Sequence, residues 1–170
     1  MENDKLPQRK KRRLKEYDYS SSGAYFITVC TQGRKHILST IRVGGGIHDA
    51  PEVVLSDIGK IVDGQIKIMN SLYENIKVEH YVIMPNHIHM IIEIDDKPGT
   101  SGRPSPTRSN ECIPRYISTL KRIVNKKCGR SIFQRSYYDH IIRNEKDYLE
   151  KRRYIGENAV KWEEDKYYKW

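Results

Sequence analysis

Two apolar segments rich in β-branched residues, 78–84 and 87–94, meet at a Pro-Asn turn at positions 85–86. This arrangement predicts a β-hairpin, because β-branched side chains favour strands and Pro-Asn favours a tight turn. In the second segment every even position is apolar, whereas His87 and His89 occupy odd positions. Side chains alternate across a strand, so one face is expected to join a core and the other to carry the two imidazoles. Such a pair can bind one metal ion, or each ring can hydrogen-bond to neighbouring groups.

The other predicted elements complete a small α+β fold. Ser56 is a typical helix N-cap, and Asn144 with Asp147 three positions later resembles a capping box. In chain order we expect a strand over 24–30, a helix over 56–73, the two hairpin strands, a helix over 113–129, a strand over 137–143 and a further helix over 144–157. The first six elements follow the ferredoxin-like split βαβ order, an antiparallel sheet with helices on one face.

Length and composition divide the chain into one domain with two extensions. A chain of 170 residues suits a single domain, which we place at 20–161. Residues 1–19 are predicted to form a basic N-terminal arm. The aromatic and charged tail, 162–170, either packs back onto the domain or stacks on bases. Two internal segments are assigned no chemistry: 32–50, a short excursion of weak strands, and 95–110, a flexible loop rich in Pro and Ser.

Charge makes nucleic acid the leading partner of this chain. Lys and Arg number 31 against 22 Asp and Glu, which gives a net charge of +9. The alternative is a basic surface that only keeps the protein in solution. The residues expected to contact DNA phosphates are Arg12 and Arg13 in the arm, Lys121 and Arg122 on the second helix, and Arg143 at the end of the last strand.

The cysteine pattern and the hydropathy of the chain predict where in the cell the protein is located. Cys30, Cys112 and Cys128 form no CxxC pair, so neither a disulfide framework nor a thiolate zinc site is expected, and the cytoplasm is the predicted location. No apolar run reaches about 18 residues, so we expect no membrane partner.

Three blocks of sequence carry a resemblance to a known family. Residues 84–92, which contain the His pair, residues 134–145, and Tyr154-Ile155 with Asn158 follow one another in the order typical of the single-tyrosine transposases of the HUH superfamily. The chain is especially similar to the REP-associated tyrosine transposases. It departs from the pattern at the end of the last block, where relatives often have Asn-Pro and this chain has Asn158-Ala159.

The resemblance implies a ferredoxin-like or RRM-like domain with a metal-dependent active site. His87 and His89, with Asn158, would bind a divalent metal, Mg²⁺ or Mn²⁺. Tyr154, on the C-terminal helix, would be the nucleophile. The implied reaction cleaves and rejoins single-stranded, hairpin-bearing DNA through a 5′-phosphotyrosine, in a monomer or a homodimer. Two other functions stay open: a non-catalytic RRM-like nucleic-acid-binding protein, and a phosphodiesterase in which a His-bound metal activates water.

Overall fold

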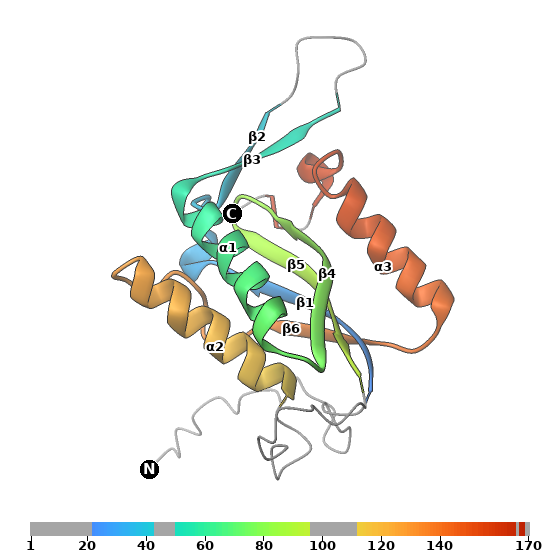
Figure 1. Cartoon of the computed structure of the whole chain (residues 1–170). Coiled ribbons are helices and arrows are strands. Elements are labelled where there is room, and N and C mark those ends of the chain that lie inside the picture. Colours follow the sequence, from blue (N-terminus) through green and yellow to red (C-terminus); the bar gives the residue numbers. More distant parts are fainter. Residues whose placement is uncertain (1–21, 43–49, 96–111, 166, 169–170) are drawn as a thin grey trace, which may run out of the picture.

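The four-stranded antiparallel sheet is the centre of the molecule. The structure is a computed structural model that describes residues 22–42, 50–95, 112–165 and 167–168. The strands are β1 (Gly23–Cys30), β4 (Ile76–Ile83), β5 (His87–Ile94) and β6 (Tyr138–Ile142), in the spatial order β4-β5-β1-β6 (Figure 1). This order places β5 between β4 and β1, as the split βαβ arrangement requires. The predicted α+β, ferredoxin-like fold is therefore confirmed.

Two helices cover one face of the sheet and form the core with it. These are α1 (Asp57–Leu72) and α2 (Cys112–Lys127). On β1 the odd positions Tyr25, Ile27 and Val29 are fully buried in this core, and the even positions of β5 are buried there as well. Both helices turn an apolar stripe toward the sheet, where residues spaced three and four apart share one face.

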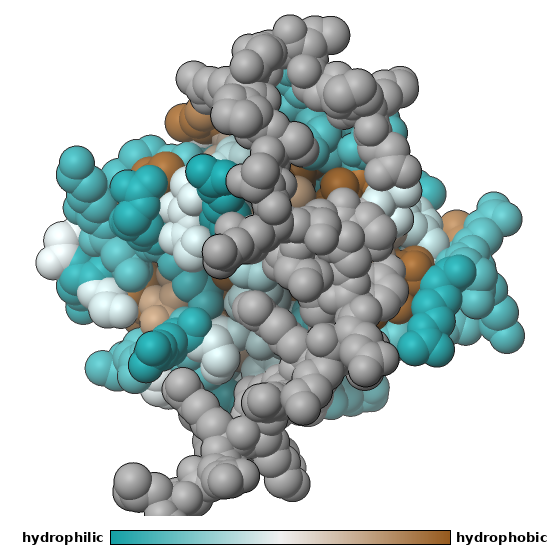
Figure 2. Space-filling model, turned by 90° about the horizontal axis from the view of Figure 1, so that it is seen from below, coloured by the Kyte–Doolittle hydropathy of each residue, from teal (hydrophilic) through white to brown (hydrophobic). Residues whose placement is uncertain are grey.

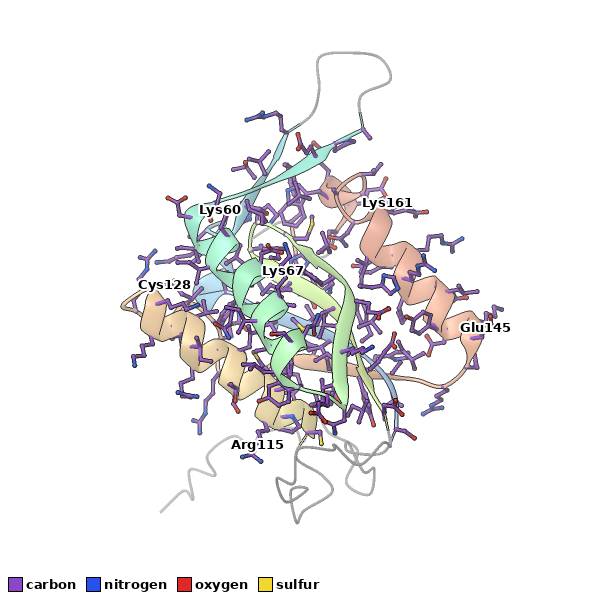
Figure 3. All side chains as sticks on the ribbon, viewed as in Figure 1. Lys60, Lys67, Arg115, Cys128, Glu145 and Lys161 are labelled. Carbon is purple, nitrogen blue, oxygen red and sulfur yellow. The ribbon has the colours of Figure 1, made fainter. Side chains whose placement is uncertain are left out.

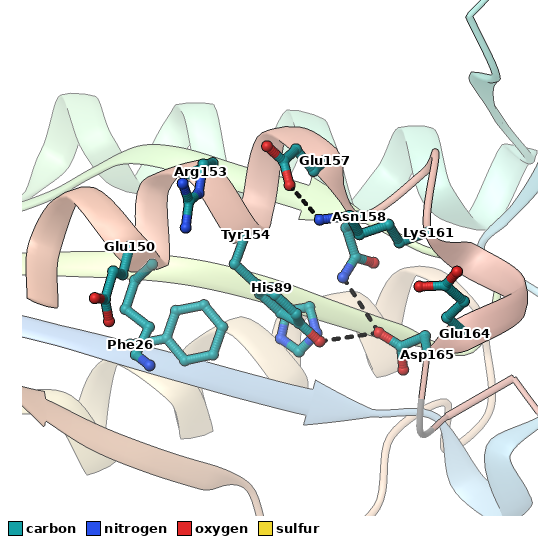
Figure 4. A pocket seen from close by; sticks show the side chains of 11 residues that line it. Phe26, His89, Glu150, Arg153, Tyr154, Glu157, Asn158, Lys161, Glu164 and Asp165 are labelled. Atoms are coloured by element: carbon teal, nitrogen blue, oxygen red, sulfur yellow. Dashed lines mark hydrogen bonds and ion pairs between the residues drawn. The ribbon is translucent and has the colours of Figure 1, made fainter.

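A third helix, α3 (Glu145–Glu157), lies on the opposite face of the sheet. Figure 4 shows α3 in front of the strands, with the other two helices behind them. Its N-cap is Asn144, whose side chain accepts a hydrogen bond from the Asp147 backbone N–H at 2.9 Å, as predicted. Ile155 is the only buried residue within α3 itself. The helix is therefore attached to the sheet by far less apolar surface than α1 or α2.

The segment before α1, where the sequence predicted weak strands over 32–50, contains more regular structure than expected. A two-stranded ribbon of β2 (Ser39–Arg42) and β3 (Glu52–Leu55) extends from the sheet, and β3 was not predicted. The ribbon packs against the start of α1, where Gly59 lies beneath the backbone of Leu38. A Cβ atom on Gly59 would stand 2.0 Å from the Leu38 carbonyl oxygen, so only glycine fits there.

Several predictions fall on residues outside the described part of the chain. The arm over 1–19 and, apart from Asp95, the loop over 95–110 lie there. No helix in the described ranges is both long enough and apolar enough to span a membrane.

Charged side chains cover the outer surfaces of the helices. Lys60 and Lys67 project from α1, whereas Glu145 and Lys161 mark the two ends of the α3 region (Figure 3). Seen from below, hydrophilic residues gather on both flanks of the molecule, where Figure 1 places α2 and α3, and hydrophobic residues show only as separate small areas (Figure 2).

Candidate active site

The two histidines of β5 lie under α3, on the face of the sheet away from the core. The register pairs His89 with Thr28 and His87 with Cys30 of β1. Nδ1 of His87 donates to Asn86 Oδ1 at 2.8 Å, and Nδ1 of His89 lies 2.8 Å from Thr28 Oγ1 in a hydrogen bond. With its proton on Nδ1, a neutral His87 carries its lone pair on Nε2, the nitrogen through which such a histidine binds metals. The ring centroids of His87 and His89 are 4.4 Å apart.

Asp165 completes a three-residue group that can bind a metal ion. One ligand atom from each of His87, His89 and Asp165 lies within 4.8 Å of the other two. Two imidazoles and a carboxylate form a donor set that is compatible with a divalent metal ion. Asp165 belongs to the predicted tail, beyond the short helix η2 (Trp162–Glu164). The sequence left the placement of the tail open, and in the described structure residues of this segment pack against the sheet.

Tyr154 of α3 and Asn158, the C-cap residue that directly follows this helix, both donate to the same carboxylate oxygen. The Tyr154 hydroxyl lies 3.0 Å and the Asn158 Nδ2 atom 3.2 Å from Asp165 Oδ2 (Figure 4). Asn158 is buried, and its Oδ1 atom has no hydrogen-bond partner among the described residues. An unsatisfied buried oxygen is costly, and a metal ion beside it would satisfy it. The residues present therefore fit a divalent metal.

Partial desolvation favours the protonated form of Tyr154, which remains 38% exposed. Desolvation, followed by the negative charge of Asp165, raises the pKa of the Tyr154 hydroxyl well above its ordinary value. The ring centroid of Tyr154 lies 5.2 Å from that of His89. The phenol thus lies beside the candidate metal ligands, with a carboxylate oxygen in position to accept its proton.

The His pair is covered by residues of the C-terminal segment. His87 and His89 are 0% and 1% exposed. The centroid of the Tyr167 ring is 4.6 Å from that of His87, and Asn86 Nδ2 donates to the Tyr167 carbonyl oxygen at 2.8 Å. Trp162 packs over His87 at 5.9 Å between ring centroids. These histidines are buried beside polar groups rather than in an apolar core.

A cavity of about 630 Å³ opens beside this group. It is lined by Phe26, His89, Tyr154, Asn158 and Asp165, with charged residues of α3 at its rim. Among the rim residues, Lys151 and Arg153 are the nearest cations to Tyr154 in the sequence, and the sequence analysis did not single them out. Helical periodicity could have identified Lys151. Lys151 precedes Tyr154 by three positions and Asn158 follows Tyr154 by four, so the three side chains share one face.

Lys121, which the sequence predicted to contact DNA, hydrogen-bonds to the backbone of the protein itself. Lys121 donates from Nζ to the carbonyl oxygens of Gln134, Ser136 and Arg135 at 2.9, 3.0 and 3.4 Å. Burial lowers the pKa of its ammonium group to about 8. In this structure Lys121 therefore stabilises the loop before β6 by hydrogen bonds, a structural role that its sequence position did not indicate.

The remaining basic residues lie away from the candidate site or outside the described ranges. Arg122 is exposed on α2, on the opposite face of the sheet from Tyr154, because α2 packs against the core side. Arg143 is exposed between β6 and α3. Arg12 and Arg13 lie outside the described residues.

Comparisons with known proteins find similarity to this chain in sequence and in structure. No family model matches the chain. An uncharacterised protein of Haemophilus influenzae is 33% identical over 177 residues, covering 96% of this chain and 94% of that protein. A REP-associated tyrosine transposase bound to a REP hairpin matches with a TM-score of 0.61 and 20% identity, over 88% of this chain and 73% of that one. A candidate transposase of Deinococcus radiodurans matches with a TM-score of 0.46 and 13% identity, over 85% and 96%.

Proposed function

Because the chain belongs to one family with the Haemophilus influenzae protein and has the fold of a REP-associated tyrosine transposase, we propose that it is a metal-dependent transposase or endonuclease that cleaves and rejoins single-stranded DNA through Tyr154. The observation that carries this proposal is the meeting of three groups at one carboxylate. The Tyr154 hydroxyl, the Asn158 amide and the His87-His89 pair all converge on Asp165. Such an arrangement joins a nucleophile, a proton acceptor and a metal-binding set.

His87, His89 and Asp165 would hold the metal, with Asn158 as a further oxygen donor beside them. When bound, a divalent ion supplies positive charge for the non-bridging oxygens of the phosphate, where negative charge builds up during displacement. The sequence resemblance implied Asn158 as the residue that completes the His pair. Asp165 is added to that set by its position in the structure.

The remaining chemistry belongs to the side chains of the chain. Tyr154 Oη forms a bond to phosphorus while the bond from phosphorus to the 3′ oxygen breaks, which leaves a 5′-phosphotyrosine. The phenol proton passes to Asp165 Oδ2, its hydrogen-bond acceptor, and the departing 3′ oxygen takes a proton from solvent. The reverse attack by another 3′-hydroxyl joins two strands. No external energy source is required, because one phosphodiester is exchanged for another.

Single-stranded DNA with a hairpin is the proposed substrate. Attack from a helix requires a backbone that can bend into the cavity, and an unpaired strand meets this need more easily than a duplex. The structural neighbour was solved with a REP hairpin. The net charge of +9 fits a polyanionic partner.

The decisive experiment looks for a covalent adduct. Full-length protein is incubated with Mn²⁺ or Mg²⁺ and a library of hairpin oligonucleotides with randomised single-stranded flanks, labelled at the 3′ end in one set and at the 5′ end in another. We expect the 3′ label to move with the protein on a denaturing gel. The 5′ label should appear on a shorter free strand that ends in a 3′-hydroxyl.

Tyr148 provides the matched control for the nucleophile. It lies on the same helix but donates to Glu93 at 2.5 Å, away from the His pair. We expect Tyr154→Phe to abolish the adduct and Tyr148→Phe to retain it. An adduct with Tyr154→Phe would contradict the assignment. Cleavage without an adduct would favour a phosphodiesterase that uses water, and binding without cleavage would favour a non-catalytic nucleic-acid-binding protein.

A further inference from the structure

Phe26 occupies an unusual position at the centre of the sheet. It lies in the middle of β1, paired with Ile91 of β5 on one side and His140 of β6 on the other. Its neighbours Tyr25 and Ile27 point to the core and are fully buried, but Phe26 points to the α3 face and is only half-buried. Figure 4 shows its ring beside Tyr154 and His89 in the cavity. The ring of Phe26 is therefore partly accessible from the cavity.

The contacts of the Phe26 ring link it to the reacting groups. It stacks on His89 with ring centroids 5.1 Å apart and planes at 26°, and meets Tyr154 edge-on at 5.9 Å. The Lys151 ammonium nitrogen lies 5.9 Å from the ring centroid. An accessible aromatic surface and a cation therefore lie together next to the proposed nucleophile.

The charges around the cavity indicate the kind of ligand that fits. Lys161 is paired with Glu157 at 2.6 Å, and Lys151 lies 3.8 Å from Asp147. Glu150 and Glu164 also line the cavity, so its rim carries both signs of charge. Such a rim disfavours a polyphosphate, whose several negative charges would meet these carboxylates. It accommodates a flat, uncharged base with a single phosphate beside it.

We propose that Phe26, with Lys151 beside it, forms a subsite that stacks one unpaired base of the DNA strand adjacent to the phosphate that Tyr154 attacks. This inference rests on the proposed function and adds to it the group that positions the strand. Stacking on an aromatic ring accepts any base, because every base has a π face. The cavity volume of about 630 Å³ is sufficient for one nucleotide. The subsite would place the scissile phosphate by holding its neighbouring base.

The test combines a protein variant with a missing base. Equilibrium binding of full-length Tyr154→Phe protein, which is expected not to cleave, is measured by fluorescence anisotropy against a hairpin with a single-stranded flank. Flank nucleotides are replaced one at a time by abasic nucleotides. We expect one position, or two adjacent ones, to weaken binding about 5- to 100-fold, the range of a single base-aromatic stack. Adding Phe26→Leu should weaken the intact strand by a similar factor and cause no further loss at the sensitive abasic position.

Two measurements separate stacking from a purely structural role of Phe26. Tyr73→Leu is the matched control, because Tyr73 is a half-buried aromatic that packs on Tyr116 on the core side of the sheet. It should leave DNA binding unchanged. A 2-aminopurine at the sensitive position should lose fluorescence on binding to the protein with Phe26 and regain it with Phe26→Leu. Mn²⁺ affinity, measured in parallel, should be the same for both proteins.

The inference is overturned if Phe26→Leu weakens intact and abasic strands equally, or if no flank position is sensitive. Its failure is distinguishable from that of the proposed function. If the adduct forms in the gel assay but the losses of DNA affinity from Phe26→Leu and from the abasic nucleotide add up, only the proposed stacking subsite would be ruled out. If Phe26→Leu and the abasic substitution prove non-additive but no adduct forms, Phe26 would still be a base-stacking residue and the transposase chemistry would be excluded.

Discussion

Asp165, which the sequence did not single out, contacts several residues of the candidate site. Its Oδ2 atom accepts hydrogen bonds from Tyr154 and Asn158, and its Oδ1 atom accepts one from the Tyr167 backbone N–H at 2.7 Å. The same carboxylate lies within metal-binding range of both histidines. One side chain therefore connects the proposed nucleophile on α3 to the proposed ligands on β5.

This arrangement predicts that Asp165→Ala weakens metal binding. Loss of the carboxylate removes one of the three candidate metal ligands and the only charged one, and we expect Mn²⁺ affinity to fall by at least about 10-fold. The concentration of free Mn²⁺ in a titration of the full-length protein, followed by electron paramagnetic resonance, measures the change. Glu163→Ala, an exposed acidic residue two positions away, is the control and should bind Mn²⁺ as the unmodified protein does. Equal affinities for the two variants would exclude Asp165 as a ligand.

Regular periodicity determines which site residues could be predicted from the sequence. His87 and His89 share a strand face by alternation, and Tyr154 and Asn158 share a helix face by their spacing of four. Asp165 follows a 3₁₀ turn in an irregular segment, where no period relates it to other residues. Phe26 belongs to a strand that is apolar on both faces, so alternation could not tell which of its side chains reach the cavity.

At the scale of elements, the start of α1 depends on a close approach to the strand ribbon. Ser56 Oγ donates to the Leu38 carbonyl at 2.9 Å and accepts from the Gly59 N–H at 3.1 Å. The N-cap was predictable because capping is local chemistry. The ribbon was not fully predicted, because β3 is only four residues long and its side chains are half-buried or exposed.

Two glycines of α1 give opposite expectations for the same substitution. Gly59→Ala would place Cβ 2.0 Å from the Leu38 carbonyl oxygen, and we expect it to lower the free energy of unfolding by at least about 2 kcal/mol. Gly64 has no neighbouring atom within 4 Å of such a Cβ, so Gly64→Ala should raise it by roughly 0.5–1 kcal/mol through helix propensity. Urea denaturation of both variants measures the difference. A similar effect at both positions would mean that the ribbon does not restrict α1.

At the scale of the whole molecule, topology assembles the site from distant parts of the chain. The split βαβ order places β5 beside β1 in the middle of the sheet, so Phe26 and His89 become neighbours although they are far apart in sequence. The order of elements was sufficient to predict this sheet, because the arrangement is common to many such chains. The sequence did not assign the last helix to a face of the sheet, and the structure places α3 opposite α1 and α2.

The weak attachment of α3 predicts a difference in hydrogen exchange. Five residues of α1 are buried, against Ile155 alone in α3. Segments with little buried apolar surface open at lower free energy than the core. Under native conditions we therefore expect the amides of α3 to exchange through openings that cost less than global unfolding, whereas those of α1 exchange near the global limit. Mass spectrometry of peptides from the two helices provides the comparison, and equal protection would contradict it.

Because α3 has a single buried residue, movement of this helix need not unfold the rest of the domain. If the helix lifts from the sheet without loss of the core, the proposed nucleophile can travel while the fold persists. A DNA end attached to Tyr154 would then move together with α3, from the strand that released it toward a second 3′-hydroxyl.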